Sequence, residues 1–291
     1  MVKFERFQLS NGLKVLVNED KSTSMVAINI LYNVGSRDEQ PDKTGFAHLF
    51  EHLMFGGSEN IESYDTPVQM VGGESNAFTS NDITNYYVVL PSDNLETGFW
   101  LESDRMLKLN FSEQSLQVQQ KVVIEEYRQR YLNQPYGDIW LLLRPLAYKV
   151  HPYRWPTIGE RIEHISDAKL EDVESFFYSH YAPNNACMTL SGNIDVDRAK
   201  HLVQMWFGDI EKRDVKVRDL PVEPVQQEAR HQTVTRNVPY DALYKTWHIP
   251  NRLDKKFYVC DLITDLLSGG KSARLYQDLV KEKKLFSDIF A

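Results

Sequence analysis

The sequence predicts an α+β domain in which helices pack on a mixed or antiparallel sheet, followed by the start of a second, related domain. The chain opens with alternating apolar and polar runs joined by an Asn-Gly turn, and several helical runs with N-cap signals follow. Strands and helices mix without the strict alternation that a parallel sheet requires. The composition, 42% hydrophobic and 25% charged over 291 residues, is ordinary for a globular protein.

Five segments are expected to form strands of the first domain. "RFQL" and "LKVLV" flank Ser10-Asn11-Gly12, so they form a hairpin. "MVAINILYNVG" is apolar enough to be a central strand. "SNAFTSNDITNYYVVLP" is interpreted as two short strands, one of them at a sheet edge, and "ACMTLSGNI" as a later strand.

The helices are predicted from their start and stop signals. Residues 47–55 and the segment Thr66–Val71 each close on a Gly-Gly pair, which ends a helix. Longer helices are expected to begin at residues that cap an N-terminus well. These starts are Ser92-Asp93, Ser112, Gly137-Asp138, Ser166-Asp167 and Asp195.

Charge and hydropathy exclude some classes of partner. A net charge of −8 and a pI near 5.5 argue against nucleic acid, because phosphate binding needs a basic face. No run reaches the roughly 18–20 apolar residues of a membrane-spanning helix. The N-terminus does not resemble a secretory signal, so we expect a cytoplasmic protein, or a periplasmic one if a signal was removed.

The stretch "GFAHLFEHLMFGG" has the pattern of a metal site. His48 and His52 are four residues apart, so both lie on one face of a helix and can reach a single ion. A catalytic zinc needs three protein ligands and an open position for water. Glu51 would sit near that position and accept the proton of the water. The alternative is a partly buried helical face that carries two histidines by coincidence.

The helix "QQKVVIEEYRQRY" offers a third ligand. One of its faces carries Gln119, Val122 and Val123, and Glu126 continues that face. Glu125 points about a hundred degrees away and fits a solvated charged surface better.

In these residues the chain resembles the M16 family of zinc metallopeptidases, the pitrilysin type with an inverted HxxEH motif, in its short-subunit form. "HLFEH" matches the zinc motif, "VVIEEY" the place of the third ligand, and "GGESNAFTSNDITNYY" the substrate-binding edge strand. "HPYRWPTIG", "YAPNNACMTLSGNID" and "LLSGGKSARLYQDLVKEKKL" match later landmarks in the same order.

The resemblance implies a zinc endopeptidase that hydrolyses extended peptides or small unfolded polypeptides. One Zn²⁺ per chain would be held by His48, His52 and Glu126, with Glu51 activating the water. Substrate would add as a strand along Asn76, Ala77, Phe78 and Thr79. Many members carry a second glutamate seven positions before the third ligand. Gln119 stands there in this sequence, where it could act on the ligands only by hydrogen bonding.

The family also implies a partner. Its peptidases are clamshells of two chains or two halves, so we expect a homodimer or a heterodimer with another M16-type chain. The far half supplies an Arg/Tyr pair for substrate, to which we assign no position in residues 1–291. A non-catalytic or partner-dependent peptide-binding subunit is the main alternative. A zinc hydrolase for other substrates is disfavoured, because an edge strand is useful only for a peptide.

The domain organisation follows from an internal similarity. "LYKTWHIPNRLDKKFYVCDLITDLLSGG" shares a strand, polar loop, helix and final Gly-Gly with the segment around the metal motif, but lacks its histidines. We therefore expect a zinc-binding domain over 1–212, a linker over 213–235, and an incomplete, homologous domain without metal over 236–291. The strand of this second copy is expected in "YDALYKTWHIP".

Overall fold

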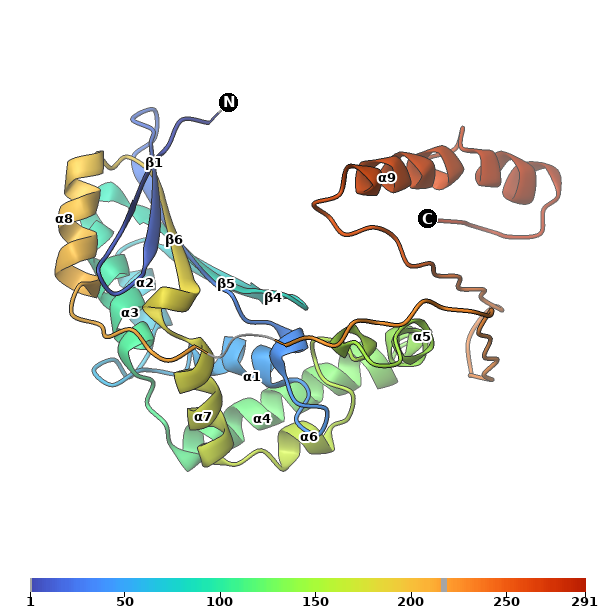
Figure 1. The fold of residues 1–291 in the computed structure, drawn as a ribbon, viewed down its shortest axis with the longest axis horizontal. Coiled ribbons are helices and arrows are strands. Elements are labelled where there is room, and N and C mark those ends of the chain that lie inside the picture. Colours follow the sequence, from blue (N-terminus) through green and yellow to red (C-terminus); the bar gives the residue numbers. More distant parts are fainter. Residues whose placement is uncertain (1, 216–218) are drawn as a thin grey trace. The chain divides into compact units, whose positions relative to one another are not determined.

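The first part of the chain is built on one six-stranded sheet (Figure 1). The computed structural model describes residues 2–215 and 219–291. They fall into two units, Met1–Asp241 and Ala242–Ala291. In the first unit the strand order is β1-β2-β6-β3-β5-β4. The strands are β1 (Glu5–Gln8), β2 (Lys14–Glu19), β3 (Met25–Tyr32), β4 (Glu74–Thr79), β5 (Thr84–Pro91) and β6 (Ala186–Gly192).

The sheet is mixed, as the sequence predicts. β2 and β6 run parallel, and the other neighbouring strands run antiparallel. β3 is central and pairs with both β5 and β6. β1 and β4 are the two edges, so β4 leaves one side of its backbone unpaired within the sheet.

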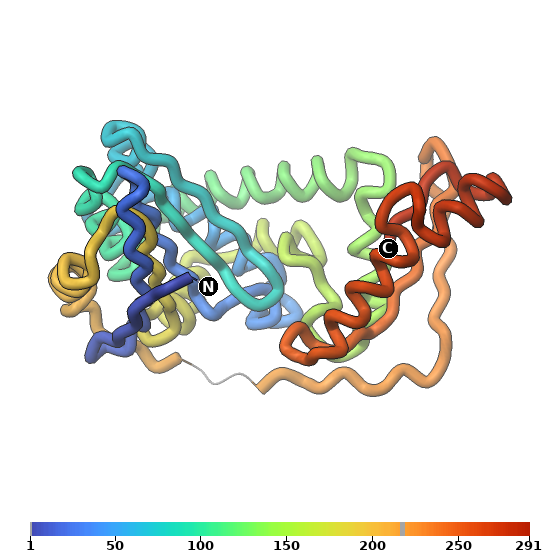
Figure 2. The backbone as a smooth tube through the Cα atoms, turned by 90° about the horizontal axis from the view of Figure 1, so that it is seen from above, coloured from blue at the N-terminus to red at the C-terminus, as the bar shows by residue number. Residues whose placement is uncertain are grey.

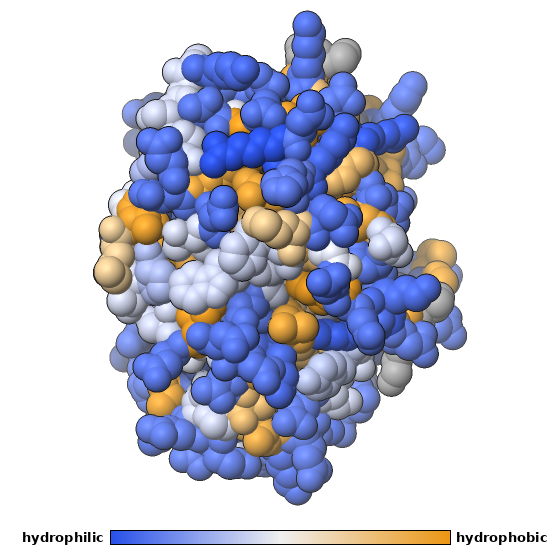
Figure 3. Space-filling model, turned by 90° about the vertical axis from the view of Figure 1, so that its left-hand side faces the viewer, coloured by the Kyte–Doolittle hydropathy of each residue, from blue (hydrophilic) through white to orange (hydrophobic). Residues whose placement is uncertain are grey.

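Several helices of the first unit pack against the strands of the sheet, and others pack on those helices. Along β3, buried Val26, Ile28, Ile30 and Tyr32 alternate with half-exposed residues, the period expected of a strand covered on one face. The outer side of the unit, over α8 (Val196–Phe207), is mainly hydrophilic (Figure 3). The helices are α1 (Phe46–Leu53), α2 (Asp65–Met70), α3 (Leu95–Leu107), α4 (Glu113–Tyr127), α5 (Ile139–Ala147), α6 (Glu163–Ser166), α7 (Leu170–His180) and α8 (Val196–Phe207).

Two helix starts show the expected capping. The Ser112 side chain accepts a hydrogen bond from Ser115 N at 3.1 Å, and Asp195 accepts from Arg198 N at 2.8 Å. The start expected at Ser166-Asp167 is wrong, because the preceding residues form the short helix α6, which ends there. The backbone is extended at Lys169 before α7 begins at Leu170.

The second unit contains the expected helix but not the expected strand. α9 (Lys255–Ser268) begins after Asp254, whose side chain accepts from Lys256 N at 2.9 Å. The strand expected at 240–250 is absent, because a strand needs a neighbour for its backbone groups and residues 242–291 contain no strand. The boundaries 1–212, 213–235 and 236–291 stay a prediction.

The segment expected as a linker is fastened to the first unit at several points. The Glu223 carboxylate accepts hydrogen bonds from the backbone nitrogens of three consecutive residues, Lys149, Val150 and His151, at 2.8 to 3.0 Å. Arg230 donates from Nη1 to Leu146 O at 2.7 Å. The segment is therefore held at these points to the preceding part of the first unit, to which it also belongs.

Candidate metal centre

The short helix α1 carries the two histidines. Its start is made possible by Gly45, whose φ of 91° lies in the left-handed region that favours glycine. Phe46, Leu49 and Phe50 are buried and hold the helix in the core. His48 and His52 are one turn apart, with ring centroids separated by 4.9 Å.

Helix α4 places Glu126 against both imidazoles. The Nε2 atoms of His48 and His52 lie 3.5 and 3.3 Å from the same carboxylate oxygen, Oε2 of Glu126. The donor atoms of the three residues all lie within 4.8 Å of one another. The structure thus brings together the three residues expected as ligands from two helices far apart in the sequence.

This donor set fits zinc. Two imidazole nitrogens and one carboxylate are a common catalytic combination, with a fourth position left for water or substrate. Ligands ~2.0–2.1 Å from a tetrahedral ion lie roughly 3.3–3.4 Å from each other. The distances from Oε2 of Glu126 to the two imidazole nitrogens, 3.3 and 3.5 Å, agree with that requirement.

The protonation states also suit a metal. Burial lowers the pKa of His48, so its imidazole is neutral and can offer a lone pair. The hydrogen bond from His52 lowers the pKa of Glu126, which favours the carboxylate. Arg130 pairs with the other oxygen of Glu126 at 2.8 Å. That leaves Oε2 as the oxygen directed at the histidines.

Glu125 lies outside this cluster. It is 58% exposed and pairs with Arg128 on the surface of α4. The helical face inferred from sequence, which Val122 shares with Glu126, is only partly buried, because Val122 is 44% exposed. The buried residues of α4 are Leu116, Gln120, Val123 and Tyr127, and Glu126 lies at the border of that face.

Glu51 is held beside the cluster by β4. The Thr79 hydroxyl donates a hydrogen bond of 2.6 Å to Oε2 of Glu51, so the carboxylate has a fixed direction. Burial raises the pKa of Glu51, against the opposing effects of the Thr79 hydrogen bond and the His52 imidazole. A carboxylate of raised pKa is well suited to take up a proton and release it again.

We expect Thr79→Val to slow turnover while zinc stays bound. Valine has the shape of threonine but cannot hold Glu51, and a hydrogen bond to a charged group is worth about 1.5–3 kcal/mol, hence a roughly tenfold or greater fall in kcat. Thr79→Ser keeps the hydroxyl and serves as the control. A kcat for Thr79→Val equal to that of the serine variant would contradict this role.

The edge strand β4 presents main-chain groups to solvent beside α1. Ser80 N donates to Ile83 O at 2.8 Å, so these two residues form a hydrogen-bonded pair across the hairpin. Back along β4 from this pair, residue pairs that are not hydrogen-bonded alternate with pairs that are. Ala77 and Thr79 therefore direct their N–H and C=O groups to the unpaired side. Ala77 N donates instead to Oδ1 of Asn76 at 2.8 Å. Figure 2 shows the β4–β5 hairpin extending alongside α1.

The remaining expected residues are less closely connected to the cluster. Phe78 is 49% exposed and points away from the core. Gln119 is half-buried on α4, with its side-chain nitrogen near Gly56, in the loop after α1. A role for Gln119 beside the ligands stays a prediction. Arg130 was not expected, although its position four residues after Glu126 is the spacing of a helical ion pair.

Two family models match the chain. One is described as "Insulinase (Peptidase family M16)" and covers residues 14–142, which include the whole cluster. The other is described as "Peptidase M16 inactive domain" and covers residues 167–291. The second match begins within the sheet unit and continues through the second unit.

Relatives and solved structures agree with these matches. The zinc protease PqqE of Helicobacter pylori is 33% identical over 299 residues, covering 99% of this chain and 66% of that protein. The crystal structure of a protease from Helicobacter pylori has a TM-score of 0.87 and 32% identity, covering 100% of this chain and 71% of its own. The periplasmic protease PqqL from Escherichia coli has a TM-score of 0.69 at 23% identity, covering 76% of this chain and 25% of its own, and so supports the fold alone.

The chain spans about two thirds of the length of the curated relatives it matches. Among the residues that the structure describes, no helix is both long and apolar enough to cross a membrane.

Proposed function

Because the chain belongs to the M16 family of peptidases, we propose that it carries the catalytic zinc site of a metalloendopeptidase. The observation that carries the proposal is the convergence of His48, His52 and Glu126, with Glu51 held next to them by Thr79. A scaffold without activity would have no need for this combination of two imidazoles, a carboxylate and an oriented base.

The proposed ligands are the Nε2 atoms of His48 and His52 and a carboxylate oxygen of Glu126, with one Zn²⁺ per chain. Bound there, zinc would supply Lewis acidity that makes water more acidic and a peptide carbonyl more electrophilic. Glu51 accepts a proton as the water oxygen bonds to the carbonyl carbon. It then passes that proton to the amide nitrogen as the C–N bond breaks. Thr79 keeps Glu51 oriented through both transfers.

The proposed substrate is an extended peptide or a small unfolded polypeptide, bound along β4. The outward-facing N–H and C=O groups of Ala77 and Thr79 would pair with its main chain. This pairing recognises little side-chain sequence, which suits varied substrates. Asn76 would then release Ala77 N, the group it occupies through Oδ1. We propose that the opposing wall of the site comes from another M16-type domain, in a homodimer or a heterodimer.

We expect Ala77→Pro to raise KM about five- to tenfold without loss of zinc. Proline removes one edge N–H, worth about 1 kcal/mol as a hydrogen bond, and is tolerated on an edge strand whose pairing does not use it. Ala77→Ser keeps the N–H and is the control. The measurement is steady-state cleavage of a fluorogenic peptide. Equal KM values in the two variants would show that the substrate does not pair with the main-chain N–H at this position.

The experiment that tests the proposed function is cleavage of an unstructured, internally quenched peptide by the full-length protein. We expect cleavage at internal bonds, seen by mass spectrometry, that a chelator abolishes and added Zn²⁺ restores. A protein that binds zinc and the peptide but leaves it intact, with and without an M16-type partner, would favour the alternative of a peptide-binding subunit.

A further inference from the structure

Glu39 is a buried carboxylate outside the proposed metal cluster. It is 7% exposed, and both of its oxygens are used at the start of α1. Oε2 accepts a hydrogen bond from Gly45 N and Oε1 accepts one from Ala47 N, each at 2.9 Å. The first N–H groups of a helix have no partner inside it, and glycine has no side chain to cap them. Glu39 therefore caps α1 from a neighbouring segment.

This cap acts on the turn that carries a proposed ligand. Ala47, which donates to Glu39, is the residue directly before His48. α1 has only eight residues, so a displacement of its first turn moves His48, Glu51 and His52 together. Sites of this kind tolerate deviations of only about 0.5 Å from their productive geometry.

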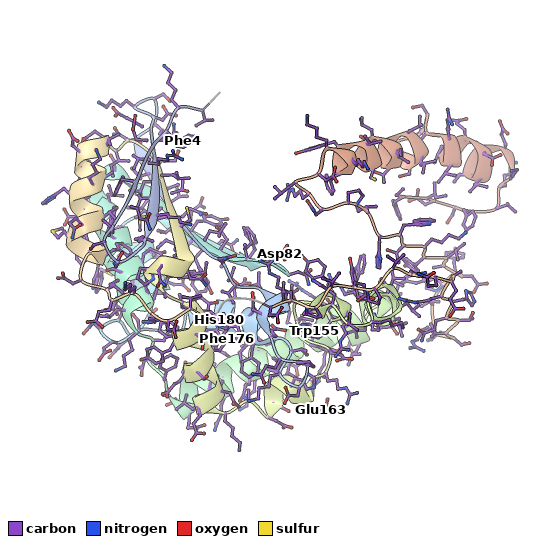
Figure 4. The ribbon with its side chains drawn as sticks, viewed as in Figure 1. Phe4, Asp82, Trp155, Glu163, Phe176 and His180 are labelled. Carbon is purple, nitrogen blue, oxygen red and sulfur yellow. The ribbon has the colours of Figure 1, made fainter. Side chains whose placement is uncertain are left out.

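The same segment is fastened at its other end to the β4–β5 turn. Ser36 N donates to Ser80 O at 3.2 Å, and Arg37 N donates to Asn81 O at 2.9 Å. Arg37 also pairs with Asp82 through Nη1 at 2.6 Å. Figure 4 shows Asp82 at the end of the hairpin that carries β4.

Two further features fix the position of residues 35–39. A Cβ on Gly35 would lie 2.5 Å from Asn81 O, so the chain passes the hairpin turn as closely as a residue without a side chain allows. Trp155, which is 2% exposed, donates from Nε1 to Ser36 O at 2.9 Å. The backbone between Gly35 and Glu39 is thus held from more than one direction.

We propose that Glu39 is a positioning residue that sets α1, and with it His48 and His52, in register with the substrate edge strand. Residues 35–39 form the link: one end holds the turn after β4, and the other holds the first turn of α1. The proposal rests on the proposed function, since it concerns the zinc ligands. The alternative hypothesis is that Glu39 stabilises the fold but has no effect on the geometry of the metal site.

The test is the affinity of the full chain for Zn²⁺, measured by competition with a chromophoric chelator. Glu39→Gln has the same size but one acceptor oxygen instead of two, and we expect about tenfold weaker binding. Glu39→Ala loses both hydrogen bonds, and we expect a loss of up to about 100-fold, the range found when groups that orient metal ligands are removed. Asp195→Ala removes the cap of α8, a helix without proposed ligands, and is the matched control. Its zinc affinity should equal that of the wild type even where its Tm falls.

The absorption spectrum of the Co²⁺-loaded protein gives an independent readout of ligand geometry. We expect Glu39→Gln to change its visible bands and Asp195→Ala to leave them unchanged. Wild-type affinity and wild-type bands in Glu39→Gln would overturn the proposal, and this variant decides the question if Glu39→Ala does not fold. A wild-type protein that binds no Zn²⁺ would instead overturn the proposed function itself.

Discussion

Glu51→Gln is expected to retain zinc and to lose about 10³-fold or more in kcat. Glutamine has the shape of glutamate and can still accept the Thr79 hydroxyl bond of 2.6 Å, so the site should keep its form. It cannot carry a proton from water to the leaving amine, and general acid–base catalysis of this type is worth about 10²–10⁴-fold. Cleavage of the quenched peptide and bound zinc are measured on the same preparation.

The pattern across variants separates the roles of Glu51 and its neighbours. Glu51→Gln and Thr79→Val should both keep the metal, with a much larger loss of kcat in the first. Activity close to the wild type in Glu51→Gln would show that Glu51 does not transfer a proton in the reaction. Loss of zinc in that variant would instead assign Glu51 to the ligands.

Glu126→Gln is expected to weaken zinc binding by several orders of magnitude, whereas Glu125→Gln should bind zinc as the wild type does. The two residues are adjacent, and the substitutions are identical in charge and size. Only Glu126 lies 3.3 to 3.5 Å from the two imidazoles, whereas Glu125 is on the surface with Arg128. A neutral amide is a poor zinc ligand compared with a carboxylate.

Chelator competition measures both variants, and circular dichroism shows that both are folded. The assignment of the third ligand fails if the two affinities fall equally or if Glu125→Gln has the larger effect. The adjacent pair thus controls for the general effect of removing one negative charge from α4.

The elements with strong local signals could be predicted from the sequence. The Asn-Gly hairpin, the caps at Ser112 and Asp195 and the helix before Gly269-Gly270 all depend on residues next to each other in the chain. The strand expected at 240–250 depends instead on a neighbouring strand, which alternation along one segment cannot reveal. Helix α6 could not be predicted either, because a helix of only four residues is too short to show a helical period in the sequence.

The candidate site likewise contains residues that the sequence could predict and contacts that it could not. His48 and His52 follow from spacing on one helix, and Glu126 follows from the helical face that it shares with Gln119 and Val123, together with the family resemblance. The Thr79–Glu51 hydrogen bond and the Glu39 cap join segments that meet only after folding. Neither has a local pattern, so neither could be read from the sequence.

The most direct test of the central claim is the amount of zinc bound per chain, by elemental analysis after loading and exhaustive dialysis, in the wild type and in His52→Ala. The account predicts close to one zinc in the wild type and none in the variant, since His52 Nε2 is one of the donor atoms gathered at Glu126. Equal zinc in both proteins, or none in the wild type, would contradict a metal centre at these residues.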